Sequence, residues 1–345
     1  MKRHRSRLFT IPLRFILSIV FLLSVVEMVG RYEMNHDNRY VTLLLQPIPA
    51  YQNAPFWSQA FQTDLSSRKL SCNYQDGYVY HSQYFNVDHC IRRIVGQPTN
   101  VSRRIWLFGS STLYTGELPD DWTIASQLQA LLPNWRIEQR TSSGAPVLVM
   151  LTMLREQDIR AGDIVIFYDG WTDSVNAFQN AQQLALPPNP ACKLLDPFFG
   201  AWHMLCDWTN TYVDPHALSP EILNPVTAEM VRHYKSALAQ ARLWTEKHGA
   251  RFVNVLGPHM WSQPLSNEEK QIEANPVLTF PAVGKFIPTL YAALRTADPQ
   301  AVDLTHELDE VRLSDPVYLD SDHIGWRGVP IIARALAQVV NKAEF

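Results

Sequence analysis

The spacing of apolar residues changes character near residue 104. From there onward, short apolar runs alternate with stretches in which apolar residues recur every three or four positions. Such runs are typical of buried strands, and the longer spacing is typical of amphipathic helices. The runs predict strands at residues 105–108, 164–168, 251–256 and 302–304. The amphipathic stretches predict helices at residues 123–132, 147–155, 228–248, 281–297 and 327–342.

This alternation predicts an α/β domain over residues 104–345, with a parallel sheet between two layers of helices. A proline-rich stretch at residues 178–226 interrupts the alternation. We interpret it as a loop-rich insertion near the carboxyl ends of the strands, where such sheets place their sites. Residues 31–103 are aromatic and polar with no sustained period, which predicts an extension ahead of the α/β domain.

The first thirty residues have the pattern of a membrane element. A basic head at residues 1–7 precedes an apolar stretch at residues 8–30 that contains Arg14 and Glu27. The stretch is long enough for the roughly 20 residues that a bilayer needs, if Arg14 reaches the inner interface. A cleaved signal peptide is the alternative, but no small-x-small cleavage site follows. We expect a single-pass anchor with a cytoplasmic N-terminus and an exported body, in a bacterial inner membrane facing the periplasm.

Composition and charge exclude two classes of protein. The 345 residues include 10 Trp, 13 Tyr and 15 Phe and are 46% hydrophobic, so a disordered chain is excluded. The net charge of −3 conceals an asymmetry, because the basic head leaves 25 basic and 32 acidic residues beyond residue 30. A body with this acidic excess has no electrostatic footprint for nucleic acid, and we expect no nucleic-acid partner.

The four cysteines form two pairs that are close in sequence. The simplest connectivity joins Cys72 to Cys90 and Cys192 to Cys206, as disulfides suited to an exported body. A zinc site is the competing interpretation, but no CxxC or nearby histidine pair accompanies the cysteines. The sequence also lacks a phosphate-binding loop, a GxGxxG run and an HExxH pair, so we expect neither a cofactor nor a metal.

Two loops about 210 residues apart carry candidate chemistry. The first is Gly109-Ser110-Ser111-Thr112, directly after the first predicted strand, where a serine hydroxyl would be exposed beside free backbone N–H groups. The second is Asp320-Ser321-Asp322-His323, just before the last predicted helix. Asp320 and His323 could supply the base and its orienting carboxylate from one turn. Asp322 is expected to point elsewhere, to solvent or to the helix N-terminus.

In the order and spacing of four blocks, the chain resembles the SGNH (GDSL-like) hydrolase superfamily, in its membrane-anchored bacterial type. Gly109-Ser110-Ser111 matches the Gly-x-Ser block, and Gly144 matches the glycine after the second strand. Gly170-Trp171-Thr172-Asp173 matches Gly-x-Asn-Asp, and Asp320 with His323 matches the final Asp-x-x-His. The resemblance implies the flavodoxin-like three-layer fold of that superfamily.

The resemblance also implies a role for each matched residue. Ser111 would be the nucleophile, His323 the base and Asp320 its orienting partner. The backbone N–H groups of Ser111 and Gly144 would form the oxyanion hole. Asp173 would hold the site residues in place without contacting the substrate. The chain departs from the family at Thr172, where the family has an asparagine whose side-chain N–H completes the hole. The Thr172 hydroxyl can donate one bond from a shorter arm, and Asn176 is an alternative donor.

These roles predict a serine esterase that removes an O-acyl (acetyl) group from an extracytoplasmic glycan or another small ester. Two alternatives stay open: an O-acyltransferase, working with a partner acyl-transferring membrane protein, and an inactive glycan-binding module on the same fold. Hydrolysis and transfer share the acyl-serine intermediate and differ in the acceptor. A sugar platform could be built from the tryptophans of the body, although each could equally be core: Trp171, Trp202, Trp208, Trp244 and Trp261.

Overall fold

The computed structural model describes residues 39–46, 48–185, 218–280 and 282–343. The predicted head and anchor, Cys192, Cys206, Trp202, Trp208 and most of the predicted insertion lie outside the described residues. Among the described residues, no helix has the length and apolar character needed to span a bilayer. The chain divides into two units, and all of the described strands lie in the unit formed by residues 40–180 and 223–345.

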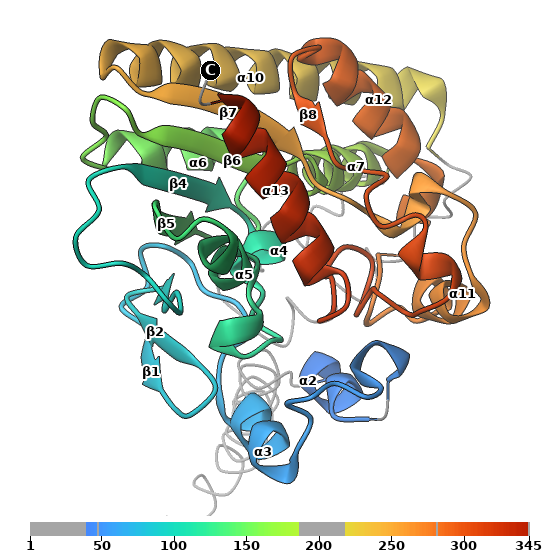
Figure 1. Ribbon diagram of the computed structural model, residues 1–345. Helices are drawn as coiled ribbons and strands as arrows, with labels where there is room; N and C mark the ends of the chain where they lie inside the picture. The colour runs from blue at the N-terminus through green and yellow to red at the C-terminus, as the bar shows by residue number, and fades with distance from the viewer. Residues whose placement is uncertain (1–38, 47, 186–217, 281, 344–345) are drawn as a thin grey trace, which may run out of the picture. The chain divides into compact units, whose positions relative to one another are not determined.

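A five-stranded parallel sheet forms the centre of this unit (Figure 1). Its strand order is β5-β4-β6-β7-β8, which is the flavodoxin-like order, in which the second strand lies on one side of the first and the later strands lie on the other side. Four of the strands confirm the predicted ones, and β5 was not predicted. The strands are β4 (Arg104–Gly109), β5 (Arg136–Thr141), β6 (Ile164–Asp169), β7 (Arg251–Leu256) and β8 (Val302–Asp303).

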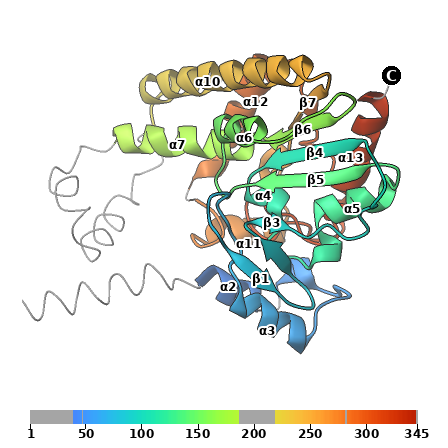
Figure 2. The same cartoon turned by 90° about the vertical axis from the view of Figure 1, so that its left-hand side faces the viewer.

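Helices cover both faces of the sheet, as predicted. On one face α5 (Ile124–Leu131) packs along α13 (Val329–Ala343) (Figure 1). On the other face α10 (Pro220–Lys247) is bonded to α6 (Val147–Arg155) through Gln240 and Arg155. It is also linked to the end of α12 (Ile287–Ala297) through Arg242 and Asp298 (Figure 2). The remaining helices of the α/β part are α4 (Ser111–Tyr114), α7 (Trp171–Ala185) and α11 (Asn267–Ala274).

The apolar pattern of the central strands explains this layering. Ile105 and Leu107 of β4 are fully buried and join the core cluster that includes α5 and α13. Because side chains alternate across a strand, Trp106 and Phe108 face the other layer, where Phe108 packs edge-on against Phe167 of β6. A strand buried on both faces reads as a continuous apolar run, which is why β4 and β6 were visible in the sequence.

The segment before the α/β domain is more regular than expected. It contains α2 (Arg39–Leu44), α3 (Gln59–Ser67) and a small antiparallel sheet. The strands of that sheet are β1 (Val79–His81), β2 (Asn86–Asp88) and β3 (Ile91–Arg92). A disulfide joins Cys72 to Cys90, as predicted, with their Cα atoms 5.6 Å apart. Strands of two or three residues are too short to produce a period that sequence inspection can detect.

Two predicted helices have different bounds in the structure. The helix expected from residue 228 begins at Pro220 and contains Pro225, which removes a single backbone hydrogen bond near the amino end. The helix expected over residues 281–297 starts only at Ile287. Ala282 has a positive φ of 62°, and a short 3₁₀ turn follows it at Val283–Lys285, so the backbone enters the α-helix later.

Candidate active site

Ser111 lies at the turn where the central strand becomes a helix. β4 ends at Gly109, Ser110 is the N-cap, and Ser111 is the first residue of α4. A Cβ at Gly109 would lie 2.8 Å from that of Leu113, so the tight turn requires glycine. The Ser110 hydroxyl is buried against that of Thr112, 3.2 Å away. The Ser111 side chain is half-buried, and its hydroxyl has no hydrogen-bond partner among the described residues.

Strand register brings three predicted site loops to the same sheet edge. Gly109 pairs with Thr141 of β5 on one side and with Tyr168 of β6 on the other. Ser111, Gly144 and Thr172 follow these paired positions by two, three and four residues. Since the strands are parallel, all three loops leave the sheet at its carboxyl edge, with the Ser111 loop between the other two.

The Gly144 loop is held in place by the N-terminal segment. Gly144 has a positive φ of 64°, a conformation that favours glycine. Two residues earlier, the Ser142 N–H donates to the carbonyl of Gly109 at 3.2 Å. The Ser143 N–H donates to the Cys72 carbonyl at 2.9 Å, and the Cys72 N–H donates back to Ser143 Oγ at 2.9 Å. Within the described structure, the N–H groups of Ser111 and Gly144 have no hydrogen-bond partner, as an oxyanion hole requires.

Thr172 and Asp173 lie in the first turn of α7, immediately after β6. Thr172 is buried, and its hydroxyl has no hydrogen-bond partner in the described part of the chain. Asp173 Oδ2 accepts from the N–H of Val147, the first residue of α6, at 3.0 Å. The Asp173 carboxyl therefore ties α7 to the start of α6, three residues after Gly144. Burial raises the pKa of this carboxyl to about 7, against the opposing effect of the N–H donors from Val147 and its own backbone.

The structure brings Asp320 and His323 together in one turn. His323 Nδ1 donates to Asp320 Oδ2 at 2.7 Å, which leaves Nε2 as the ring nitrogen available for a substrate-side proton. The other carboxylate oxygen, Oδ1, accepts from the backbone N–H groups of Asp322 at 3.0 Å and of His323 at 2.8 Å. The geometry is that of a base whose tautomer is set by a buried carboxylate.

Tyr40 and Glu117 extend this pair, and neither was predicted. The Tyr40 hydroxyl lies 2.6 Å from Asp320 Oδ2 and 3.3 Å from Glu117 Oε1. Burial alone would raise the pKa of Asp320. The charge of His323 and the hydrogen bonds from His323, Tyr40 and Asp322 outweigh burial and keep that pKa below its usual value. No local sequence signal pairs residue 40 with residue 320, so only the tertiary structure reveals this contact.

Asp322 contradicts the expectation that it points to solvent or to the helix N-terminus. It is buried, and its Oδ1 accepts from the Ser321 hydroxyl at 3.0 Å and lies 3.8 Å from His323 Nδ1. Its Oδ2 is buried and has no hydrogen-bond partner in the described structure. Burial raises the pKa of this carboxyl to about 8 in spite of the nearby His323 charge. The backbone of Ser321 holds the loop inward, because its N–H donates to the Leu278 carbonyl at 3.2 Å and its carbonyl accepts from the Met260 N–H at 3.4 Å.

Three carboxyl groups therefore act electrostatically on the imidazole of His323. Burial by itself would lower the pKa of His323, but the negative charges of Asp320, Asp322 and Glu117 hold it well above the usual histidine value. No hydrogen bond joins His323 to the Ser111 hydroxyl among the described residues. In unliganded enzymes such bonds are often long and shorten only when substrate binds. Glu117, six residues after Ser111, links the nucleophile segment to the base through Tyr40.

The predicted tryptophan platform is only partly assembled. Trp171 and Trp261 stack with ring centroids 6.0 Å apart and planes 8° apart, at the carboxyl end of the sheet. Trp244 lies in the last turn of α10, shortly before β7 begins, and packs against His248. That position is at the amino end of the strands, so Trp244 cannot share a surface with Trp171 at the site edge. The reason is simply that α10 runs antiparallel to the strand that follows it.

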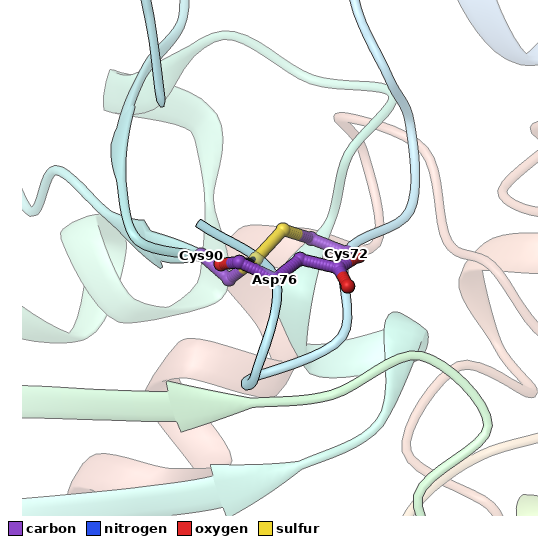
Figure 3. Close-up of side chains that lie close together, drawn as sticks. All are labelled: Cys72, Asp76 and Cys90. Atoms are coloured by element: carbon purple, nitrogen blue, oxygen red, sulfur yellow. Dashed lines mark hydrogen bonds between the residues drawn. A yellow bond between two sulfur atoms is a disulfide. The ribbon is translucent and has the colours of Figure 1, made fainter. Parts of the chain in front are cut away.

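A cavity of about 490 Å³ borders the predicted oxyanion donor. One wall is Ser142–Ala145, which contains Gly144, and the other wall is the loop Asn73–Asp76, which follows the disulfide. Figure 3 shows the Asp76 side chain beside the Cys72–Cys90 bond. The described residues that line the cavity include one carboxylate, Asp76, and no Lys, Arg or His. This lining suits an uncharged polar group better than an anion.

No family model matches the chain, and no curated protein matches it. The solved structures to which it is similar include a member of the lipolytic G-D-S-L family from Veillonella parvula, with 12% identity over 69% of this chain and 98% of that one, and a TM-score of 0.42. A catalytic mutant of an acetylxylan esterase from Geobacillus stearothermophilus has 14% identity over 69% of this chain and 94% of that one, with a TM-score of 0.39. An extracellular lipase from Streptomyces rimosus has 14% identity over 68% of this chain and 100% of that one, with a TM-score of 0.34. Ester hydrolases thus recur among these structures. At such low identities and TM-scores, the activity has to be argued from the side chains of the site.

Proposed function

We propose that the protein is an SGNH-type serine esterase that works through an acyl-Ser111 intermediate. The observation that carries the proposal is the hydrogen bond of 2.7 Å between His323 Nδ1 and Asp320 Oδ2. In the same unit Ser111, whose hydroxyl has no partner among the described residues, begins a helix at the edge of the sheet. Unpartnered N–H groups on Ser111 and Gly144 lie in the two adjacent loops at that edge. A nucleophile, an oriented base and oxyanion donors are the components that acyl transfer needs.

In the acylation half of the reaction, Ser111 Oγ attacks the ester carbonyl carbon while His323 Nε2 takes the hydroxyl proton. The carbonyl oxygen becomes an oxyanion and accepts hydrogen bonds from the N–H groups of Ser111 and Gly144, with the Thr172 hydroxyl as a third donor. The carbon–oxygen bond to the alcohol then breaks, and His323 returns the proton to the leaving oxygen. Asp320 orients the imidazole and stabilises its charged form without taking a proton.

In the deacylation half, water replaces the alcohol. His323 takes a proton from the water as its oxygen attacks the acyl carbon, and the same oxyanion donors receive the negative charge. Collapse of this intermediate breaks the bond to Ser111 Oγ, which recovers its proton from His323. The products are a carboxylic acid and the free enzyme.

For the substrate, we propose an O-acyl group, acetyl in the simplest case, on an extracytoplasmic glycan. The cavity beside Gly144 supports this choice, because its lining is polar and the described part of it contains no cation that would select a charged acyl chain or a phosphate. The predicted N-terminal anchor and the Cys72–Cys90 disulfide support an exported body tethered to the membrane.

Labelling with a fluorophosphonate probe tests the proposal, because the probe reacts with activated serines. The wild-type protein is expected to be labelled and to hydrolyse a small acetyl ester, and Ser111→Ala is expected to lose both properties. Ser110→Ala is the matched control. Its hydroxyl is buried against Thr112, so the label should remain. Hydrolysis by Ser111→Ala should fall by about 10⁴- to 10⁶-fold, as for a nucleophile that acts together with its base.

Each outcome of this experiment separates the candidates. A labelled protein that hydrolyses acetyl esters slowly, but transfers their acetyl group through Ser111 to an added oligosaccharide, is an O-acyltransferase. A wild-type protein that is never labelled but binds an oligosaccharide is an inactive glycan-binding module. Labelling that survives in Ser111→Ala would show that the nucleophile is a different serine.

A further inference from the structure

Asp320 receives more hydrogen bonds than a dyad of aspartate and histidine requires. Its Oδ2 accepts from His323 Nδ1 at 2.7 Å and from the Tyr40 hydroxyl at 2.6 Å. Its Oδ1 accepts from two backbone N–H groups of its own turn. The turn alone would produce three of these four bonds, and the fourth comes from a residue 280 positions earlier. A contact from so far away has to be built by the fold.

Tyr40 is seated firmly enough to hold this position. It lies in α2, and Leu44, four residues later, is fully buried in the main core cluster. Residues four apart lie on the same face of a helix, so the buried Leu44 directs Tyr40 inward as well. The Tyr40 ring packs against the same core cluster. Burial, together with the charges of Asp320 and Glu117, raises the pKa of Tyr40 well above its usual value, so the hydroxyl keeps its proton.

Glu117 completes the chain of contacts from the other side. Its Oε1 lies 3.3 Å from the Tyr40 hydroxyl, and the Tyr51 hydroxyl donates to its backbone carbonyl at 2.9 Å. A single tyrosine proton can serve one acceptor at a time, and Asp320 is the closer of the two carboxyl groups. The longer contact makes Glu117 the second acceptor within reach of the same hydroxyl. Burial raises the pKa of Glu117, against the opposing effects of the His323 charge and the hydrogen bond from Tyr40.

We infer that Tyr40 and Glu117 are positioning residues of the catalytic base, in a relay that runs from Glu117 to Tyr40, to Asp320 and to His323. The inference rests on the proposed function, because it assigns Tyr40 and Glu117 a role in positioning the proposed base, His323. Tyr40 fixes the rotation of the Asp320 carboxylate so that Oδ2 stays aligned with His323 Nδ1. The segment just after residue 39 thereby becomes part of the active site, although it touches neither the substrate nor Ser111.

Tyr40→Phe tests the first link of the relay. It keeps the ring in the core and removes only the hydroxyl. We expect kcat on a small acetyl ester to fall about 10- to 100-fold, the factor that a hydrogen bond to a charged group commonly represents, with KM unchanged. Tyr80→Phe is the matched control, because the Tyr80 hydroxyl donates to a different carboxylate, that of Asp64, at 3.0 Å. Both variants should lose similar thermal stability, but Tyr80→Phe should keep its kcat.

A double-mutant cycle with Asp320→Asn separates positioning from general stability. If Tyr40 acts through Asp320, Tyr40→Phe should cost little once Asp320 has been replaced. Glu117→Gln should retain more activity than Glu117→Leu, since the amide can still form a hydrogen bond with the Tyr40 hydroxyl. The inference would be overturned if Tyr40→Phe lowered kcat by the same factor in the wild-type protein and in Asp320→Asn. It would also be overturned if kcat were unchanged in Tyr40→Phe. Failure of the proposed function looks different, because the wild-type protein would then show neither labelling nor hydrolysis.

Discussion

The two sides of the candidate site differ in how completely their polar groups are bonded. On the side of the base, both oxygens of Asp320 are occupied by four donors, and the Asp320–His323 pair is largely buried. On the side of the nucleophile, the hydroxyls of Ser111 and Thr172 and the N–H groups of Ser111 and Gly144 have no partner among the described residues. Gly144 is also exposed to solvent.

This difference corresponds to the times at which the two sides act. A general base has to be in the correct tautomer before the reaction starts, so its bonds are made in the resting protein. An oxyanion exists only during the reaction, and donors that were already bonded inside the protein would have to break those bonds first. Donors left free and held by the backbone pay no such cost. Substitutions on the two sides should therefore have different consequences.

The largest effect is expected from a substitution on the side of the base, at Asp320. Asp320→Asn keeps the shape but replaces an acceptor oxygen with an N–H₂ group, which favours the wrong tautomer of His323. We expect kcat to fall about 10⁴-fold, the loss that this change causes in a Ser-His-Asp triad. Asp322→Asn, with kcat measured on the plateau at high pH, is the matched control, because Asp322 Oδ1 lies 3.8 Å from His323 Nδ1 and makes no hydrogen bond to it. Equal losses in the two variants would mean that Asp322 orients the base.

A smaller effect is expected from a substitution on the side of the nucleophile, at Thr172. Thr172→Val removes the hydroxyl at nearly constant volume, and we expect kcat on an acetyl ester to fall about 10- to 100-fold, less than the 10²–10³ of a well-aligned donor. Thr172→Asn introduces the longer amide arm of the family block and should raise kcat above the wild-type value. An unaffected kcat in Thr172→Val would show that Thr172 is no oxyanion donor and would direct attention to Asn176.

The predictability of the site from sequence follows the same division. Ser111, Asp320 and His323 could be found because each lies in a short block beside an apolar strand or helix. β5 was missed because it is an edge strand in which Ile137 is the one apolar residue among six, although Gln139 and Thr141 are also buried. Tyr40 and Glu117 were missed because their role depends on a contact across 280 and 77 residues of sequence. Local patterns carry no information about such contacts.

The smallest expected effect is a shift in the pH dependence of the base. The acidic limb of kcat/KM reports the ionisation of the free enzyme's base, which is active only when neutral. Asp320, Asp322 and Glu117 face His323 and hold its pKa well above the usual value, so activity should develop only above pH 6.5. Asp322 in turn faces Tyr168 and Tyr291, which stay neutral over this range. Because Asp322 ionises near pH 8, its titration overlaps that of His323 and broadens the limb.

Asp322→Asn removes one of the charges that favour protonated His323. The limb should therefore move to lower pH and become steeper, while the plateau at high pH changes little. The measurement is kcat/KM on a small acetyl ester over roughly pH 5 to 10, the range in which a shifted histidine titrates. Asp88→Asn is the control, because it removes a carboxylate from an exposed aspartate that lies 3.0 Å from His81 in the small antiparallel sheet, and it should leave the limb in place. If the limb of Asp322→Asn instead stays in place, the charge of Asp322 does not act on His323, and the raised pKa of His323 is due to Asp320 and Glu117 alone.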